Sequence, residues 1–333
     1  MIPSPVVERL YVAAATASNR RHRNDDAIGF DGWVLGGEDV NPLRMIRRLR
    51  RDRSVAIAVT DGMSIAPDGD LAARLAALTL TDRRYATDPT EQTVVDVFDR
   101  ANAAITKSSH DDNRGMGCAA ALVVVRPDGI ALIGNVGDVR IYWTVDGYLG
   151  QLTEDDRRDS SGKLSRCLGG RIPTSVVPHP HHIQVRPGDR LLMCTDGLHD
   201  AVDPGDIEKC LEMEVEYGVA ELVRTAKASD RSDGGNITAV VIEIGRSPQT
   251  DIRSASPNPV QAASPVVAPP AVGGADSHAA PTQPREAHHR PPQGHPQPPP
   301  PEDAPKGVGK SLVSGVKRAL GFGPEDDPNG RRE

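Results

Sequence analysis

The chain of 333 residues is poor in aromatic side chains, with two Trp, five Tyr and three Phe. No run approaches the ~18 apolar residues of a membrane-spanning helix. The N-terminus lacks a basic stretch followed by an apolar one, as a secretory signal has. Its four cysteines are far apart in sequence, which excludes a CxxC metal motif and favours reduced thiols over disulfides. We therefore expect a cytoplasmic protein.

An excess of basic residues is also missing. There are 39 Lys and Arg against 46 Asp and Glu, so the formal net charge is −7. Residues 247–333 contain nine of each sign, so the whole excess of acid lies in residues 1–246. Nucleic-acid binding needs a basic surface, and we expect no such partner. An acidic body that handles an anionic substrate would need metal cations or local arginines.

Proline and aromatic residues divide the chain in the same place. Of the 29 prolines, 18 follow Arg246, where Phe322 is the single aromatic residue. We therefore predict a folded domain over 1–246, a disordered Pro-rich linker over 247–306 and a tail over 307–333. In the tail, Val308–Leu320 has the pattern of a short basic amphipathic helix. This segment either contacts a membrane surface or a partner weakly, which would make the protein peripheral to the membrane, or is inert.

Apolar runs separated by turn residues predict many short strands. The strands come in hairpins, and we expect four helices, two early in the chain and two late. This order favours an α+β fold, an antiparallel β-sandwich flanked by helix layers (α-β-β-α), over a parallel sheet. The basic stretch 42–53 is interpreted as a solvated helix face or loop. The predicted strands are Val6–Ala17, Ala27–Leu35, Ser54–Thr60, Ala119–Arg126, Ile130–Val136, Val139–Val145, Tyr148–Leu152, Arg190–Cys194 and Ile237–Ile244, and the helices Asp70–Leu80, Thr90–Lys107, Pro204–Leu211 and Ala220–Ala228.

Aspartates recur in turns beside the predicted strands. A single Asp-Gly is most simply a plain turn. Several acids at strand ends, brought together by packed sheets, would instead form an oxygen-rich site for Mg²⁺ or Mn²⁺. The turns contain Asn24–Asp26, Asp61–Gly62, Gly137–Asp138, Asp196–Gly197 and Asp233–Asn236.

The order of these motifs resembles that of the metal-dependent protein phosphatases, the PPM or type 2C family, in its bacterial form. Pro187–Leu198 is close to the family's G-D-x-L-L-L-x-[ST]-D-G-L, and Gly134–Arg140 is similar to A-N-V-G-D-S-R. The resemblance covers about residues 10–245 in collinear order. The other matching segments are Arg21–Asp26, Val59–Met63, Gly115–Gly117, Gln151–Asp155, Leu164–Gly169 and Gly235–Thr238.

This resemblance implies a serine/threonine phosphatase that uses two Mn²⁺ or Mg²⁺ ions and a metal-activated water. Its substrate would be a phosphoprotein, a Ser/Thr kinase or one of that kinase's targets. By position, Arg21 would hold the phosphate, and Asp61 would bridge both metals and serve catalysis. The remaining metal-site residues implied by position are the Gly62 carbonyl, Asp196, Asp26 beside the metals, and Asp138 and Asp200 at a third, weaker ion.

One departure from the family bears on activity. The final D-N-[IV]-T has Gly235 in place of the metal-ligand Asp, and Asp233 is the substitute we consider. A lost carboxylate should weaken the metal. The alternative function is therefore an impaired pseudophosphatase that acts as a binding or regulatory module. A carboxylate-lined calcium adaptor has no support, because no EF-hand loop is present.

Overall fold

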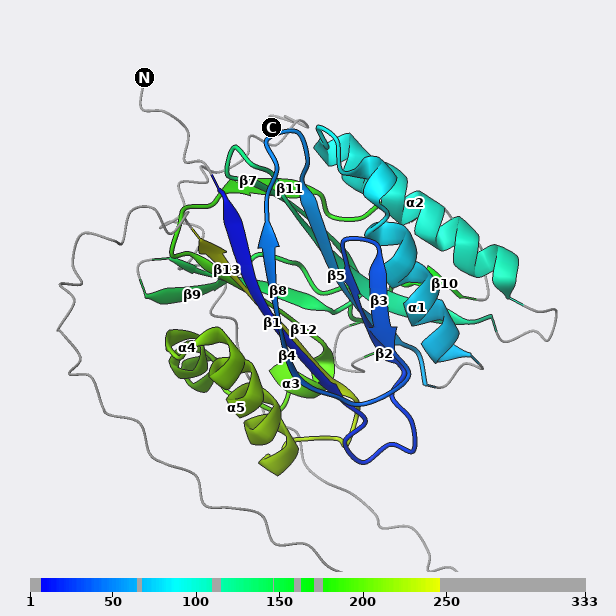
Figure 1. The fold of residues 1–333 in the computed structure, drawn as a ribbon. Helices are drawn as coiled ribbons and strands as arrows, with labels where there is room; N and C mark the ends of the chain where they lie inside the picture. Colours follow the sequence, from blue (N-terminus) through cyan, green and yellow to red (C-terminus); the bar gives the residue numbers. More distant parts are fainter. Residues whose placement is uncertain are drawn as a thin grey trace, which may run out of the picture. The chain divides into compact units, whose positions relative to one another are not determined.

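The computed structural model describes residues 7–64, 68–109, 115–145, 147–158, 163–170 and 176–245 (Figure 1). The predicted linker and the Val308–Leu320 helix lie outside these residues and remain predictions. Among the helices that are described, none has both the length and the apolar composition of a membrane-crossing segment.

Two antiparallel sheets form the centre of the domain. The first has the strand order β4 (Val40–Arg48), β1 (Arg9–Ala17), β13 (Ile237–Gly245), β12 (Arg190–Cys194), β8 (Arg140–Val145) and β9 (Tyr148–Gln151). The second has the order β11 (His181–Gln184), β7 (Ile130–Val136), β6 (Gly117–Val125), β5 (Val55–Gly62), β2 (Asp26–Phe30) and β3 (Trp33–Gly36), with β10 (Leu168–Gly169) paired to β6.

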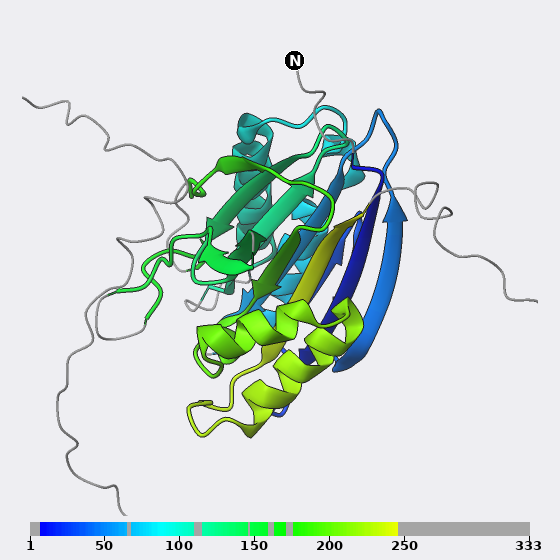
Figure 2. The same cartoon turned by 90° about the vertical axis from the view of Figure 1, so that its left-hand side faces the viewer.

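Helices cover the outer face of each sheet (Figures 1 and 2). The second sheet packs against α1 (Gly69–Leu80) and α2 (Glu91–Ser108), with the short 3-10 turn η1 (Arg83–Tyr85) between them. The first sheet packs against α4 (Pro204–Glu212) and α5 (Val215–Ala228), which follow the single-turn α3 (Asp196–His199). The predicted α-β-β-α architecture is confirmed.

Strand β5 is apolar along most of its length because both of its faces are buried. Its odd-numbered side chains, Val55, Ile57 and Val59, pack in the layer between the sheets. Its even-numbered side chains, Ala56 and Ala58, pack against the helices. Successive side chains of a strand point to opposite faces, so a strand covered on both faces is a continuous apolar run. The small alanines leave room for α1 and α2.

Two local predictions were wrong. The stretch 42–53 is neither helix nor loop over most of its length, because β4 forms an edge strand that pairs with β1. The predicted strand Ala27–Leu35 is a hairpin of β2 and β3, which turns at Asp31 and Gly32, both with positive φ (46° and 86°). Arginines at an exposed edge strand match the charge pattern of a solvated helix, and two short strands match one long apolar run.

Candidate active site

The site lies where the apolar layer between the sheets ends in carboxylates. Asp61 continues the inward-facing series of β5, and Asp26 continues that of β2 after Ile28. The antiparallel register places Asp26 directly opposite Asp61. Cβ atoms of such partners are about 4.5–5.5 Å apart. Two acids 35 positions apart in sequence are thus neighbours on one face because of the register.

Threonines from the first sheet hold the Asp26 carboxylate. Its Oδ2 atom accepts a hydrogen bond of 2.6 Å from Thr238 Oγ1 on β13 and one of 3.1 Å from Thr195 Oγ1 after β12. Its Oδ1 atom is buried and has no donor among the described protein groups. Asp61 can bond to Asp26 only while one of the two carboxyls carries a proton. One oxygen of Asp26 is therefore fixed, and the other lacks a cationic or N–H partner.

The carboxylates raise one another's pKa. Burial, with the negative charge of Asp196, raises the pKa of Asp26 to about 7 against the bonds from Thr238 and Thr195. Burial and the charges of Asp26, Asp196 and Asp138 raise the pKa of Asp61 well above its ordinary 3.8. Burial and Asp138 likewise raise that of Asp196. Desolvation and like charges both disfavour ionisation, and a divalent cation would relieve both.

Glycine and asparagine make the turns at this rim tight. A Cβ on Gly62 would come within 2.4 Å of Gly69 O and 2.5 Å of Asp25 O, and one on Gly197 within 2.0 Å of Asn236 O. Asn236 Oδ1 accepts a bond of 2.9 Å from the Asp25 amide. Side chains at either glycine would push these strand ends apart, so the Asp-Gly pairs are close-packed parts of the rim.

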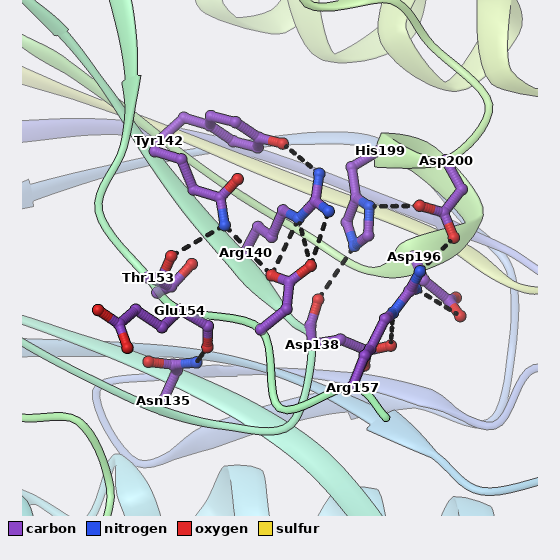
Figure 3. Close-up of polar contacts among 12 residues, drawn as sticks. Asn135, Asp138, Arg140, Tyr142, Thr153, Glu154, Arg157, Asp196, His199 and Asp200 are labelled. Carbon is purple, nitrogen blue, oxygen red and sulfur yellow. Dashed lines mark hydrogen bonds and ion pairs between the residues drawn. The ribbon is translucent and has the colours of Figure 1, made fainter. Parts of the chain in front are cut away.

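Arg157 connects three further acids at the same rim (Figure 3). Its Nε lies 2.7 Å from Asp138 Oδ2, its Nη1 2.9 Å from Asp200 Oδ2 and its Nη2 3.5 Å from Asp196 Oδ2. His199 bridges the same group, with Nε2 3.0 Å from Asp138 O and Nδ1 3.0 Å from Asp200 Oδ1. Despite burial, hydrogen bonds and charge from His199 and Arg157 lower the pKa of Asp200.

Arg21 and Asp233 lie together at the edge of the site. Arg21 Nη1 donates to Ser64 Oγ over 3.1 Å, and its Nη2 is 3.9 Å from Asp233 Oδ2. Asp233 Oδ1 accepts a bond of 2.7 Å from the Gly235 amide. Among the described contacts, none joins Asp233 to Asp61 or Asp196. In this arrangement Asp233 therefore does not take the place of the missing metal ligand at position 235.

The structure brings five of the predicted acids together: Asp26, Asp61, Asp138, Asp196 and Asp200. Sequence reasoning missed Arg157 and the threonine anchors of Asp26. Arg157 follows the Gln151–Asp155 motif by two residues, but an isolated arginine there carries no signal of its own. Thr238 is part of the last motif, Gly235–Thr238, and the alternation of side chains along β13 could have indicated the direction in which it points.

A thiol close to the site has no chemical role in this arrangement. Cys194 is fully buried at the end of β12, and burial raises the pKa of its thiol well above the ordinary range. A nucleophilic cysteine needs a lowered pKa and access to substrate. Cys194 is therefore a packed thiol and not a nucleophile.

The oxygen donors of the rim fit hard divalent cations, although they do not form a complete coordination site. Carboxylate oxygens are the ligands that Mg²⁺ and Mn²⁺ prefer, and Asp26 Oδ1 is a buried oxygen without a donor. In the described part of the chain, however, no three His, Cys, Asp or Glu side chains are arranged to hold an ion as they stand. Rim side chains would have to move to bind an ion, and the contact between Arg157 and Asp196 would have to open.

Comparison with known proteins gives a consistent family. Residues 46–227 match the family model described as protein phosphatase 2C. The "Serine/threonine phosphatase stp" of Listeria innocua is 26% identical over 253 residues, which cover 67% of this chain and 91% of that protein.

Solved structures show the same fold. The PPM Ser-Thr phosphatase MsPP from Mycobacterium smegmatis, in complex with cacodylate, has a TM-score of 0.55 and 25% identity over 72% of this chain and 100% of that one. The catalytic domain of serine threonine protein phosphatase PstP, in complex with 2 manganese ions, has a TM-score of 0.51 and 22% identity over 71% of this chain and 100% of that one.

Proposed function

This chain belongs to the protein phosphatase 2C family, the metal-dependent protein phosphatases of bacterial type, and from that premise we propose that it is an active protein serine/threonine phosphatase. It hydrolyses phosphoserine and phosphothreonine with two Mn²⁺ or Mg²⁺ ions. The observation that carries this proposal is the facing pair Asp26 and Asp61, with Asp196 close enough to raise the pKa of both.

We assign the metal-holding role to this carboxylate group. Asp61 is close enough to Asp26 and Asp196 for both charges to raise its pKa, and it would contact both ions, with the Gly62 carbonyl and Asp196 as further ligands. Asp26, which the threonines fix through Oδ2, would offer Oδ1 directly or through water. When bound, the ions would offset the phosphate charge and lower the pKa of an attacking water molecule.

Arg21 would bind the phosphate. Its side chain is 44% exposed, and its nearest acid, Asp233, is 3.9 Å away. A guanidinium with unused N–H donors can bind two phosphoryl oxygens at once. Arg21 would orient the phosphoryl group toward the carboxylate rim, where the phosphate would compete with the long contact to Asp233 and the 3.1 Å bond to Ser64 Oγ.

The substrates would be phosphoproteins, either a Ser/Thr kinase or the targets of one. We place the protein in the cytoplasm, consistent with the four free cysteines. The Pro-rich linker 247–306 would tether the tail over 307–333, whose Val308–Leu320 helix would make weak contact with a partner or a membrane surface.

One observation favours the alternative of a catalytically impaired binding module. Position 235 has no carboxylate, and Asp233 bonds to the Gly235 amide and pairs with Arg21. If the ion on Asp196 binds too weakly to be occupied, the chain would recognise phosphoproteins without turnover.

Hydrolysis of p-nitrophenyl phosphate and of a phosphothreonine peptide by the full chain tests the proposal. We expect activity with Mn²⁺, silence in EDTA, and a loss on the order of a thousandfold in Asp61→Ala, since a catalytic metal is worth several kcal/mol. Asp52→Ala, which removes an exposed acid paired with Arg50, is the matched control. Undiminished activity in Asp61→Ala would refute the metal assignment. Mn²⁺ binding without turnover would favour the impaired module.

A further inference from the structure

Each nitrogen of the Arg157 guanidinium faces a different carboxylate. The two short contacts, 2.7 Å and 2.9 Å, go to Asp138 and Asp200, and the longest, 3.5 Å, goes to Asp196. The side chain is only 22% exposed. Arginine keeps its charge in proteins, and its planar fork suits carboxylates better than a point charge does. It is therefore a permanent cation inside the acidic rim.

The main chain beside Arg157 is fixed to the turn that carries Asp138. The Asp156 amide donates to Gly137 O over 2.8 Å, and the Gly137 amide donates to Asp156 Oδ2 over 3.0 Å. Asp156 O in turn accepts a bond of 2.7 Å from the Ser165 amide. Because these three bonds hold Asp156, the residue directly before Arg157, the Arg157 side chain starts from a defined position next to Asp138.

The lengths of the three contacts indicate which acid Arg157 can release most easily. An ion between Asp138 and Asp200 would have to break both short, charge-assisted bonds and expel a guanidinium that is mostly buried. An ion on Asp196 competes only with the 3.5 Å contact. The positive charge of Arg157 at the first pair would also repel a divalent cation that approached it.

We propose that Arg157 is a tethered cation that takes the place of a third metal ion in this protein. It stays on Asp138 and Asp200, and it releases Asp196 when that residue binds a metal. Arg157 thereby determines how many divalent ions the rim accepts. The inference rests on the proposed function, because it takes Asp61 and Asp196 as the metal-holding acids.

Equilibrium dialysis of the full chain against Mn²⁺, with elemental analysis of the bound metal, tests this directly. We expect Arg157→Gln to bind one more Mn²⁺ per chain than the unaltered protein, with weak affinity. Adding Asp138→Asn to Arg157→Gln should remove that extra ion. Arg157→Lys, which keeps the charge, should bind the same number as the unaltered chain. Arg51→Gln removes an exposed arginine elsewhere and should change nothing.

The outcomes separate this proposal from the proposed function. If the unaltered chain binds Mn²⁺ and is active, but Arg157→Gln and Arg157→Lys both match it in stoichiometry and affinity, the role of Arg157 is overturned and the phosphatase proposal stands. Loss of a bound ion on Asp138→Asn in the otherwise unaltered chain would also overturn it, since Arg157 would not be excluding that ion. If no variant binds Mn²⁺, both proposals fail.

Discussion

Two groups of acids in this protein differ in how their charge is balanced. Asp31, 2% exposed, is paired with two arginines, Arg47 and Arg83. At the rim, Arg157 and His199 contact three of the five acids, which are Asp138, Asp196 and Asp200. Asp26 and Asp138 of the rim are buried, like Asp31, whereas Asp196 and Asp200 are partly exposed, so burial alone does not distinguish the two groups. The excess of negative charge at the rim distinguishes the two groups, because carboxylates without a counter-charge destabilise the fold unless a cation binds them.

The largest effect we expect is on the pH dependence of stability without metal. The pKa of Asp26 is about 7 in the folded protein against 3.8 ordinarily, so the folded state keeps a proton that the unfolded state loses. In EDTA, the free energy of unfolding should therefore fall between about pH 4 and pH 7, by up to about 4 kcal/mol at 1.36 kcal/mol per pKa unit.

Urea unfolding at several pH values in EDTA measures this slope. Saturating Mn²⁺ should reverse it, because protons compete with the metal for the same carboxylates. Asp26→Asn should flatten it. A free energy of unfolding that rises with pH through this window in EDTA would contradict the raised pKa.

The second prediction sets the two acid groups against each other. Asp31→Asn leaves two partly exposed arginines without a counter-charge and should lower the free energy of unfolding by about 1–2 kcal/mol. Asparagine tolerates the positive φ of position 31. Asp61→Asn removes a charge that Asp26, Asp196 and Asp138 repel, so in EDTA it should raise that free energy by about 1 kcal/mol.

Urea unfolding of both variants and of the unaltered chain in EDTA measures whether each substitution raises or lowers the free energy of unfolding. Shifts in the same direction would show that the rim is balanced in the same way as the Asp31 group. In Mn²⁺, Asp61→Asn should lose its advantage, since the variant removes a ligand.

A third prediction concerns the missing carboxylate. A Cβ at position 235 would approach only the flexible Asp233 carboxylate within 3.0 Å, at 2.9 Å from Oδ1. Asn236 lies against Gly197, beside Asp196. Gly235→Asp should therefore be accommodated and tighten Mn²⁺ binding by about tenfold, because ligand charge sets affinity for hard cations. Calorimetry measures it, with Gly235→Asn as the uncharged control. Equal affinity in both variants would refute the missing-ligand account.

The smallest effect concerns the support of Asp26. Thr238→Val removes the 2.6 Å bond to Asp26 Oδ2 and the 2.7 Å contact with Thr16. It should cost about 1 kcal/mol of stability, as for a typical buried hydrogen bond. Thr79→Val, which removes a bond to Leu75 O on α1, is the control. Thermal unfolding compares the two, and weaker Mn²⁺ binding in Thr238→Val alone would show that the anchor serves the rim.

Much of the fold was predictable because the pattern repeats. The continuous apolar runs of β5 and β6 and the Thr90 cap before α2 each have a local physical cause. The edge strand β4 was not predictable in this way, since Met45 and Ile46 are adjacent, as are Arg47 and Arg48, so its apolar and basic residues do not alternate. Its identity comes from pairing with β1.

The sequence by itself determined the acids that can form a site, the strand alternation that turns Asp61 inward, and the glycines at close-packed turns. Those features are local, because a strand's facing and a turn's shape depend on neighbouring residues. Only the tertiary structure decided that Asp26 lies opposite Asp61, that Asp233 stays with Arg21, and that Arg157 enters the carboxylate rim. These depend on strand register and on contacts between segments far apart in the chain, which no local pattern specifies.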